Sequence, residues 1–174
     1  MSFLHYTRRQ SGQSLVEFAT LLPLIILLII GAAETGNALN AYIGVTNAAR
    51  EGVRLAARGN IYSDAQIKQV IKSQTQYLDL EAHGSIVMTV VRSNTTGFVS
   101  YTTSQLLGAS TSRFNASSLA TLHQLAISTA NKVYLSKERF IVMEVFYNCP
   151  TLTRFLWSSI PLYSYSVMQV SAAS

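Results

Sequence analysis

The hydrophobic and polar positions divide the chain into one long apolar segment near its N-terminus and a mixed remainder. Residues 18–33 carry no charged side chain, and residues 24–30 are wholly aliphatic. As a helix, the run from Leu15 to Ala33 spans about 28 Å, close to the roughly 30 Å thickness of a bilayer core. The pattern therefore predicts a single membrane-spanning helix followed by one small domain.

The helical pattern continues well beyond the apolar segment. We expect residues 14–58 to form one helix, kinked near Pro23 because proline removes a backbone donor. Gly31, Gly36 and Gly44 leave flat surfaces on which helices approach closely in lipid. Beyond the apolar segment, a stripe of mostly apolar residues recurs at helical spacing: Leu39, Ile43, Thr46, Ala49, Val53 and Ala56. The lower half of this stripe is expected to dock the chain's own domain.

The remaining chain predicts an α+β domain, a helix packed against an antiparallel sheet of about four strands. The helix is expected over residues 63–78, beginning with a capping box at Ser63 and Gln66. β-Branched and alternating residues predict strands at 85–92, 98–103, 140–147 and 163–170. Between them we expect a turn at 94–97, a polar loop at 105–118, a short helix at 119–126 and an irregular connection at 151–161.

Charge gives this layout a direction across the membrane. The net charge is +5, and Arg8 and Arg9 supply two of these charges ahead of the apolar segment. The positive-inside rule places this end in the cytoplasm and the C-terminal domain across the membrane. The predicted organisation is a leader at 1–12, a long helix at 13–59 with a membrane span at 15–33, and a globular domain at 60–174. The other basic residues are mostly scattered, which disfavours nucleic acid as a partner.

Glu17 is an anomaly at the head of the apolar helix. A carboxylate costs about 2.5–3.5 kcal/mol at mid-bilayer and less near the interface. One interpretation is that the Glu17 side chain reaches the headgroups or favours the positive N-terminal end of the helix dipole. If the chain is cut after Gly12, however, Glu17 becomes the fifth residue, one helical turn from the new α-amino group of Gln13. That group, in the same or a neighbouring subunit, would attract Glu17 strongly in lipid and set the register of docking.

These residues resemble the class III leader of type IV pilins and pseudopilins: basic residues, a glycine, then a hydrophobic helix with glutamate five residues on. The opening Gly12–Ala19 (GQSLVEFA) with Leu22-Pro23-Leu24 is similar to TadE-like proteins, minor pilins or pseudopilins of Flp/Tad pilus systems. The run Asn47–Gly59 is similar to a later segment of that family. The Ser/Thr-rich middle, residues 93–131, is long for the family, which leaves a minor or a filament-forming role open.

The resemblance implies processing between Gly12 and Gln13 by a prepilin peptidase, and assembly roles for Glu17, Phe18 and Pro23. The implied partners are other pilin subunits, identical or different, the Tad secretion and assembly machinery, and the lipid bilayer before assembly. The implied location is the inner (cytoplasmic) membrane, crossed once with the C-terminus outside, and then an extracellular pilus or the cell surface.

Arg50, Arg54 and Arg58 recur at every fourth position on one helix face. A solvated face near the helix C-terminus is the favoured interpretation. The alternative is a row of contacts to a neighbouring subunit or to lipid headgroups.

The C-terminal domain shows no residue pattern typical of catalysis. His83, His123 and the single cysteine, Cys149, are far apart, and neither a phosphate loop nor metal-ligand spacing occurs. We expect no enzymatic activity, no cofactor and no metal. Glu144 lies within a predicted strand, and we expect it on a solvent-facing side. Trp157 is expected to pack in the core, with an interface or adhesive patch as the alternative.

Two other interpretations remain open. The chain could be a signal-anchored extracytoplasmic binding or adhesion domain that does not polymerise. It could also be a secreted protein that an ordinary signal peptidase cuts near Gly31-Ala32-Ala33. The N-terminal residue of the mature protein separates these interpretations: Gln13 for the pilin, Met1 for the anchor, and Glu34 or a neighbour for secretion.

Overall fold

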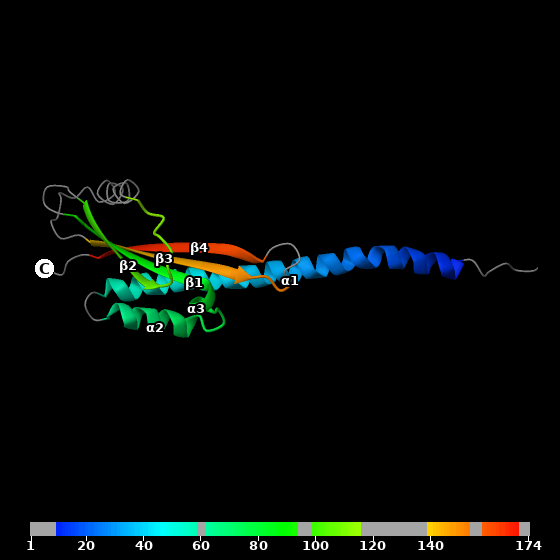
Figure 1. The fold of residues 1–174 in the computed structure, drawn as a ribbon, viewed down its shortest axis with the longest axis horizontal. Helices are drawn as coiled ribbons and strands as arrows, with labels where there is room; N and C mark the ends of the chain where they lie inside the picture. Colours follow the sequence, from blue (N-terminus) through cyan, green and yellow to red (C-terminus); the bar gives the residue numbers. More distant parts are fainter. Residues whose placement is uncertain (1–9, 59–61, 94–98, 116–138, 154–157, 171–174) are drawn as a thin grey trace, which may run out of the picture.

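A long helix carries a small domain on its C-terminal half and projects from it as a bare rod (Figure 1). The computed structural model describes residues 10–58, 62–93, 99–115, 139–153 and 158–170. This architecture confirms the predicted α+β class with a long N-terminal helix and a small antiparallel sheet.

The long helix, α1 (Gln10–Ala57), runs through both Gly12 and Pro23. It begins four residues before the predicted start at residue 14, so Gly12 lies inside the helix. Pro23 lacks an amide hydrogen, and the carbonyl of Ala19 therefore lacks its usual helical donor.

Two short helices follow where one was predicted. α2 (Asp64–Gln74) begins with the expected capping box: the Ser63 amide donates to Gln66 Oε1 at 2.9 Å, and the Gln66 amide donates to Ser63 Oγ at 3.3 Å. The helix ends early at its C-cap Thr75, whose hydroxyl donates to the Ile71 carbonyl and whose amide donates to the carbonyls of both Ile71 and Lys72. A turn then leads to α3 (Leu80–His83). The prediction of one helix over 63–78 is therefore wrong in its last four residues.

Four antiparallel strands form one sheet in the order β2-β1-β3-β4. The strands are β1 (Gly84–Ser93), β2 (Val99–Leu107), β3 (Arg139–Pro150) and β4 (Ser159–Val170). Each predicted strand exists, but β2 extends into the predicted loop at 105–118, and β4 begins within the predicted connection at 151–161. The expected turn at 94–97 and helix at 119–126 lie outside the described residues.

The main core lies between α1 and one face of the sheet. Alternate side chains of β3 enter it, among them Ile141, Met143 and Val145, and all three are fully buried. α2 lies alongside α1 (Figure 1) and adds Ile67 and Ile71 to the same core.

Only the lower half of the predicted stripe on α1 enters this core. Ala49, Val53 and Ala56 are buried, which confirms that part of the prediction. Leu39 and Ile43 remain 58% and 51% exposed. The docking face is rotated away from them and begins instead with Ala41, Val45 and Ala48.

The glycines of α1 fall into two groups. A Cβ atom at Gly52 would approach Ile71 Cδ1 to 2.8 Å and Met143 Cγ to 3.0 Å, and one at Gly44 would meet Tyr77 and Leu78. Gly44 and Gly52 therefore let the domain approach α1 closely. Gly31 and Gly36 have no atom within 4 Å of such a Cβ. Of the three glycines predicted to present flat surfaces to other helices, Gly44 faces the chain's own domain instead.

The opposite face of the sheet is covered as well, and this overturns the prediction for Glu144. Glu144 is 0% exposed, because the segment after β2 crosses over it. Its carboxylate accepts hydrogen bonds from the Arg113 amide at 2.9 Å, from the Tyr163 hydroxyl at 3.0 Å and from the Ser112 hydroxyl. The Arg113 guanidinium also lies over the Tyr163 ring, 4.2 Å from its centroid.

Candidate assembly site and neck

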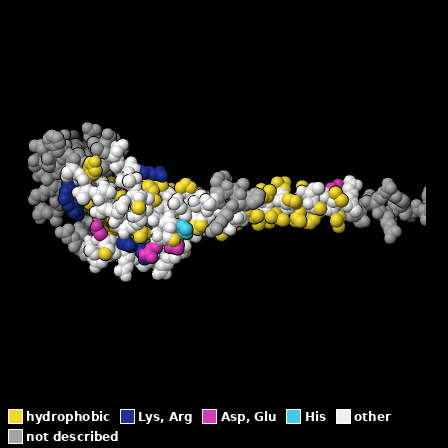
Figure 2. Space-filling model, viewed as in Figure 1, with side chains coloured by type: hydrophobic (Ala, Val, Ile, Leu, Met, Phe, Trp, Pro, Cys, Tyr) yellow, Lys and Arg dark blue, Asp and Glu magenta, His cyan; other side chains and the backbone are white. Residues whose placement is uncertain are grey.

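The predicted assembly residues lie together on the bare part of α1. Gly12, Gln13, Glu17, Phe18 and Pro23 are all exposed, Phe18 to 61%. α1 is long and apolar enough to cross a membrane, and its most apolar stretch has no residue buried in the protein. Figure 2 shows hydrophobic side chains along the length of this stretch. The domain therefore leaves the assembly residues uncovered.

The Glu17 carboxylate has a neutral partner one turn earlier on the helix. Gln13 Nε2 donates to Glu17 Oε1 at 3.1 Å, and the Thr20 hydroxyl donates to the Glu17 carbonyl at 2.8 Å. An amide donor does not neutralise a carboxylate. Neither of the ion pairs among the described residues involves Glu17. Among the described residues, Glu17 therefore has a hydrogen-bond donor beside it but no basic partner.

Three arginines lie on the exposed side of α1 near its C-terminal end. Arg50, Arg54 and Arg58 all point away from the core. Arg54 Nε donates to Glu51 Oε2 at 2.7 Å, which lowers the pKa of Glu51 and raises the pKa of Arg54. Exposed pairs of this kind contribute at most about 1 kcal/mol. Arg54 already has a partner on its own helix, which favours the solvated face that the sequence suggested.

Glu34, the first charged residue after the apolar span, was not among the predicted assembly or contact residues. Glu34 Oε2 accepts from the Leu152 amide at 3.0 Å, and Oε1 accepts from the Thr153 amide and hydroxyl, each at 2.9 Å. These donors favour the charged form, so the pKa of Glu34 lies below its usual 4.5. The pairing is invisible in the sequence because 118 positions separate Glu34 from Leu152. The charge directly after Ala33 is the only signal that marks it.

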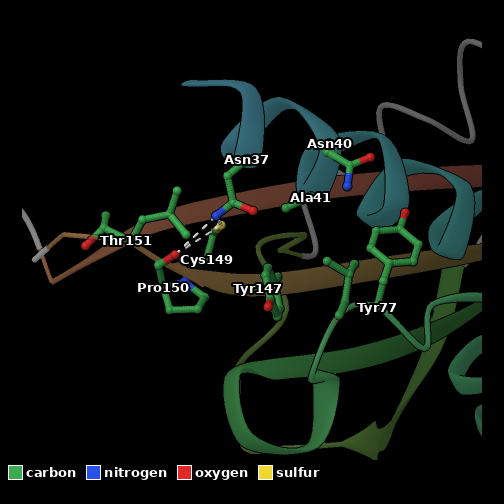
Figure 3. A pocket seen from close by; sticks show the side chains of 10 residues that line it. Asn37, Asn40, Ala41, Tyr77, Tyr147, Cys149, Pro150 and Thr151 are labelled. Carbon is green, nitrogen blue, oxygen red and sulfur yellow. Dashed lines mark hydrogen bonds between the residues drawn. The ribbon is translucent and has the colours of Figure 1, made fainter. Parts of the chain in front are cut away.

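Asn37 fastens the same region one turn further along α1. Its Nδ2 donates to the Pro150 carbonyl at 3.4 Å and lies 3.6 Å from Cys149 Sγ (Figure 3). We call this junction of α1 with the end of β3, comprising Glu34, Asn37 and residues 149–153, the neck.

An open pocket of about 440 Å³ lies at the neck, between α1, the turn after α2 and the end of β3. Asn40 and Tyr77 line it beside Asn37 and Cys149 (Figure 3). The Cys149 thiol is largely buried, and burial raises its pKa, with the nearby Glu34 charge adding to the effect. A protonated, buried thiol suits packing rather than nucleophilic chemistry. Among the described residues, no cluster of three or more potential metal ligands occurs.

Part of α1 matches a known protein family. Residues 12–54 match the family model described as TadE-like protein. The match begins at Gly12 and contains Glu17, Phe18 and Pro23, so the resemblance inferred from the sequence motifs is confirmed over this segment. Neither a curated protein nor a solved structure matches the chain.

The TadE-like segment covers the bare part of α1 and most of its docked part, and the sheet lies outside it. It associates the chain with Tad pilus systems, a structural rather than an enzymatic setting. Together with α1, the one helix among the described residues that is long and apolar enough to cross a membrane, it indicates a membrane-anchored, surface-exposed protein.

Proposed function

We propose that this chain is a structural pilin or pseudopilin subunit of a Tad/Flp pilus. It is cut after Gly12, held in the membrane by residues 15–33, and then assembled into a filament through its N-terminal helix. The observation that supports this most is Glu17: a carboxylate five residues after Gly12 with no basic partner among the described residues, on a helix whose most apolar stretch is not buried in the protein.

The exposed apolar part of α1 packs first against lipid and then against other subunits. Large hydrophobic side chains from Leu15 to Ile29 are exposed all around it. A helix that is apolar on every side is buried in lipid or among other helices. In this proposal it lies in the bilayer first, and neighbouring subunits replace the lipid during assembly.

Glu17 sets the register of that assembly. Cutting after Gly12 turns the amide nitrogen of Gln13 into a positively charged α-amino group. The hydrogen bond from Gln13 to Glu17 shows that residue 13 is within one helical turn of the carboxylate. An ion pair between these groups, within one subunit or between two, is strong where little water screens it, and it penalises subunits that dock out of register.

The test is the variant Glu17→Ala, with Glu17→Gln to separate charge from size. We expect both variants to be inserted and processed normally, but to form fewer and shorter filaments by electron microscopy. Glu51→Ala is the matched control, because it removes an acid from the same helix outside the apolar span. Unchanged filament number and length in the Glu17 variants would show that the register role is wrong.

A further inference from the structure

The connection between β3 and β4 is fastened to α1 at the residue where the apolar span ends. Glu34 follows Ala33 directly, and its carboxylate accepts three hydrogen bonds from Leu152 and Thr153. Asn37 holds the end of β3 one turn further on. The domain therefore meets α1 with no free helix between the predicted membrane span and the neck.

This position fixes the height of the neck above the membrane. The span 15–33 is centred on Leu24, and Glu34 lies ten residues further, about 15 Å along the axis. That distance places Glu34 at the edge of a hydrocarbon core about 30 Å thick, and the headgroup region extends about 5–7 Å beyond it. Leu152 and Thr153, bonded to the Glu34 carboxylate, lie at the headgroup level.

Two features of the neck suit that environment. The three donors replace water around Glu34, which lowers the cost of a carboxylate beside hydrocarbon. Leu152 is apolar, yet 65% of its side chain is exposed.

We propose that Leu152 and Thr153, where the connection between β3 and β4 begins, form a membrane-interface contact, in which Leu152 enters the lipid headgroup region while Glu34 holds these two residues to α1. The domain then rests on the outer surface of the bilayer before assembly. This inference depends on the membrane insertion in the proposed function. The competing explanation is that a second copy of the chain, rather than lipid, covers Leu152.

The contact is tested with a polarity-sensitive fluorophore on single introduced cysteines in the full chain. Three variants are compared: Leu152→Cys at the neck, Leu24→Cys at the centre of the span, and Tyr101→Cys at the far end of the sheet. Tyr101 is exposed and pairs with Val91, which pairs with Phe140 at the start of β3, so it lies at the end opposite to the neck. The unsubstituted chain reports any labelling of the buried Cys149.

Each variant is reconstituted at low density in phosphatidylcholine–phosphatidylglycerol vesicles that carry nitroxide quenchers at shallow or deep positions. We expect shallow quenchers to act strongly on the label at position 152, deep quenchers on that at 24, and neither on that at 101. The emission at 152 is expected to shift to the blue relative to 101.

Three results would overturn the inference. If the label at 24 is quenched but that at 152 behaves like that at 101, the membrane contact is wrong while the proposed function stands. If the label at 152 shifts to the blue only when subunits are crowded or assembled, a second copy covers Leu152 instead. If the label at 24 is not quenched, the membrane insertion is wrong, and the inference falls with it.

Discussion

Glu17, Glu34 and Glu144 carry the same chemical group in three different environments. Glu17 stands on a bare apolar helix with only an amide beside it. Glu34 joins that helix to the end of the domain. Glu144 is fully buried in the sheet under the segment that follows β2. Removing each of these side chains should therefore affect a different property: assembly, attachment of the neck, and stability of the domain.

Removing the buried carboxylate should destabilise the domain. Glu144→Ala leaves the Arg113 amide and the hydroxyls of Ser112 and Tyr163 without their acceptor, at a cost of about 1–3 kcal/mol in the free energy of unfolding. Denaturant unfolding of the full chain in detergent measures this cost. Glu81→Ala is the control, because Glu81 forms an exposed pair with Lys72 and its removal should destabilise the domain much less than removal of the buried Glu144. Equal effects of the two variants would contradict the structural role of Glu144.

The attachment of the neck should weaken in acid. Because the folded state lowers the pKa of Glu34 from 4.5, this interaction stabilises the fold at pH values above 4.5 and is lost as the pH falls through the lowered pKa. Hydrogen exchange of a peptide covering Leu152 and Thr153 should show protection that decreases in this window, after correction for intrinsic rates. In Glu34→Gln the protection should be lower and independent of pH. If the protection in the wild-type protein stays constant on acidification, the Glu34 carboxylate does not hold Leu152 and Thr153 to α1.

At the scale of elements, the glycines of α1 make a matched comparison. Gly52→Leu forces a side chain between Ile71 and Met143 in a filled core and should destabilise the domain by about 1–3 kcal/mol. Gly36→Leu adds the same side chain in open space, where leucine favours a helix over glycine by up to about 1 kcal/mol. Thermal unfolding of both variants measures the difference. If Gly52→Leu unfolds at the same temperature as Gly36→Leu, the close contact at Gly52 is wrong.

The sequence patterns located the elements better than their ends. The capping box at Ser63 and the aliphatic alternation of β1 and β3 are local signals, so the sequence reveals them. The end of α2 depends on Thr75, whose hydroxyl competes for a helical carbonyl, while the apolar period continues to Leu78. The strand predicted at 98–103 stops short of the end of β2, because residues 104–107 carry no strand pattern of their own and belong to β2 through their pairing with β1.

The assembly residues at the start of α1 could be predicted from the sequence, but the contacts of Glu34 and Glu144 could not. The Gly12–Glu17 spacing and the apolar span lie within one continuous helix, so their relation can be worked out from the sequence. Glu34 and Glu144 depend on contacts with residues far along the chain. Their partners are mostly backbone amides and hydroxyls, which leave no charge pattern to find.

At the scale of the whole molecule, the apolar part of α1 and the domain are two separate parts of the chain. Among the described residues, the most apolar stretch of α1 contributes nothing to the domain's core and is not buried by it. The neck joins the two parts at the predicted edge of the membrane. The TadE-like match covers residues 12–54, the helix rather than the sheet, which is consistent with assembly being the property shared with that family.

The N-terminal residue of the mature protein tests the central claim most directly. The protein is purified from the membrane and from sheared surface material of its host, and its N-terminus is read by intact mass and terminal peptide sequencing. The pilin account predicts that the chain begins at Gln13, because the cut after Gly12 creates the charge that pairs with Glu17. A mature chain that begins at Met1 or near Glu34 would contradict it.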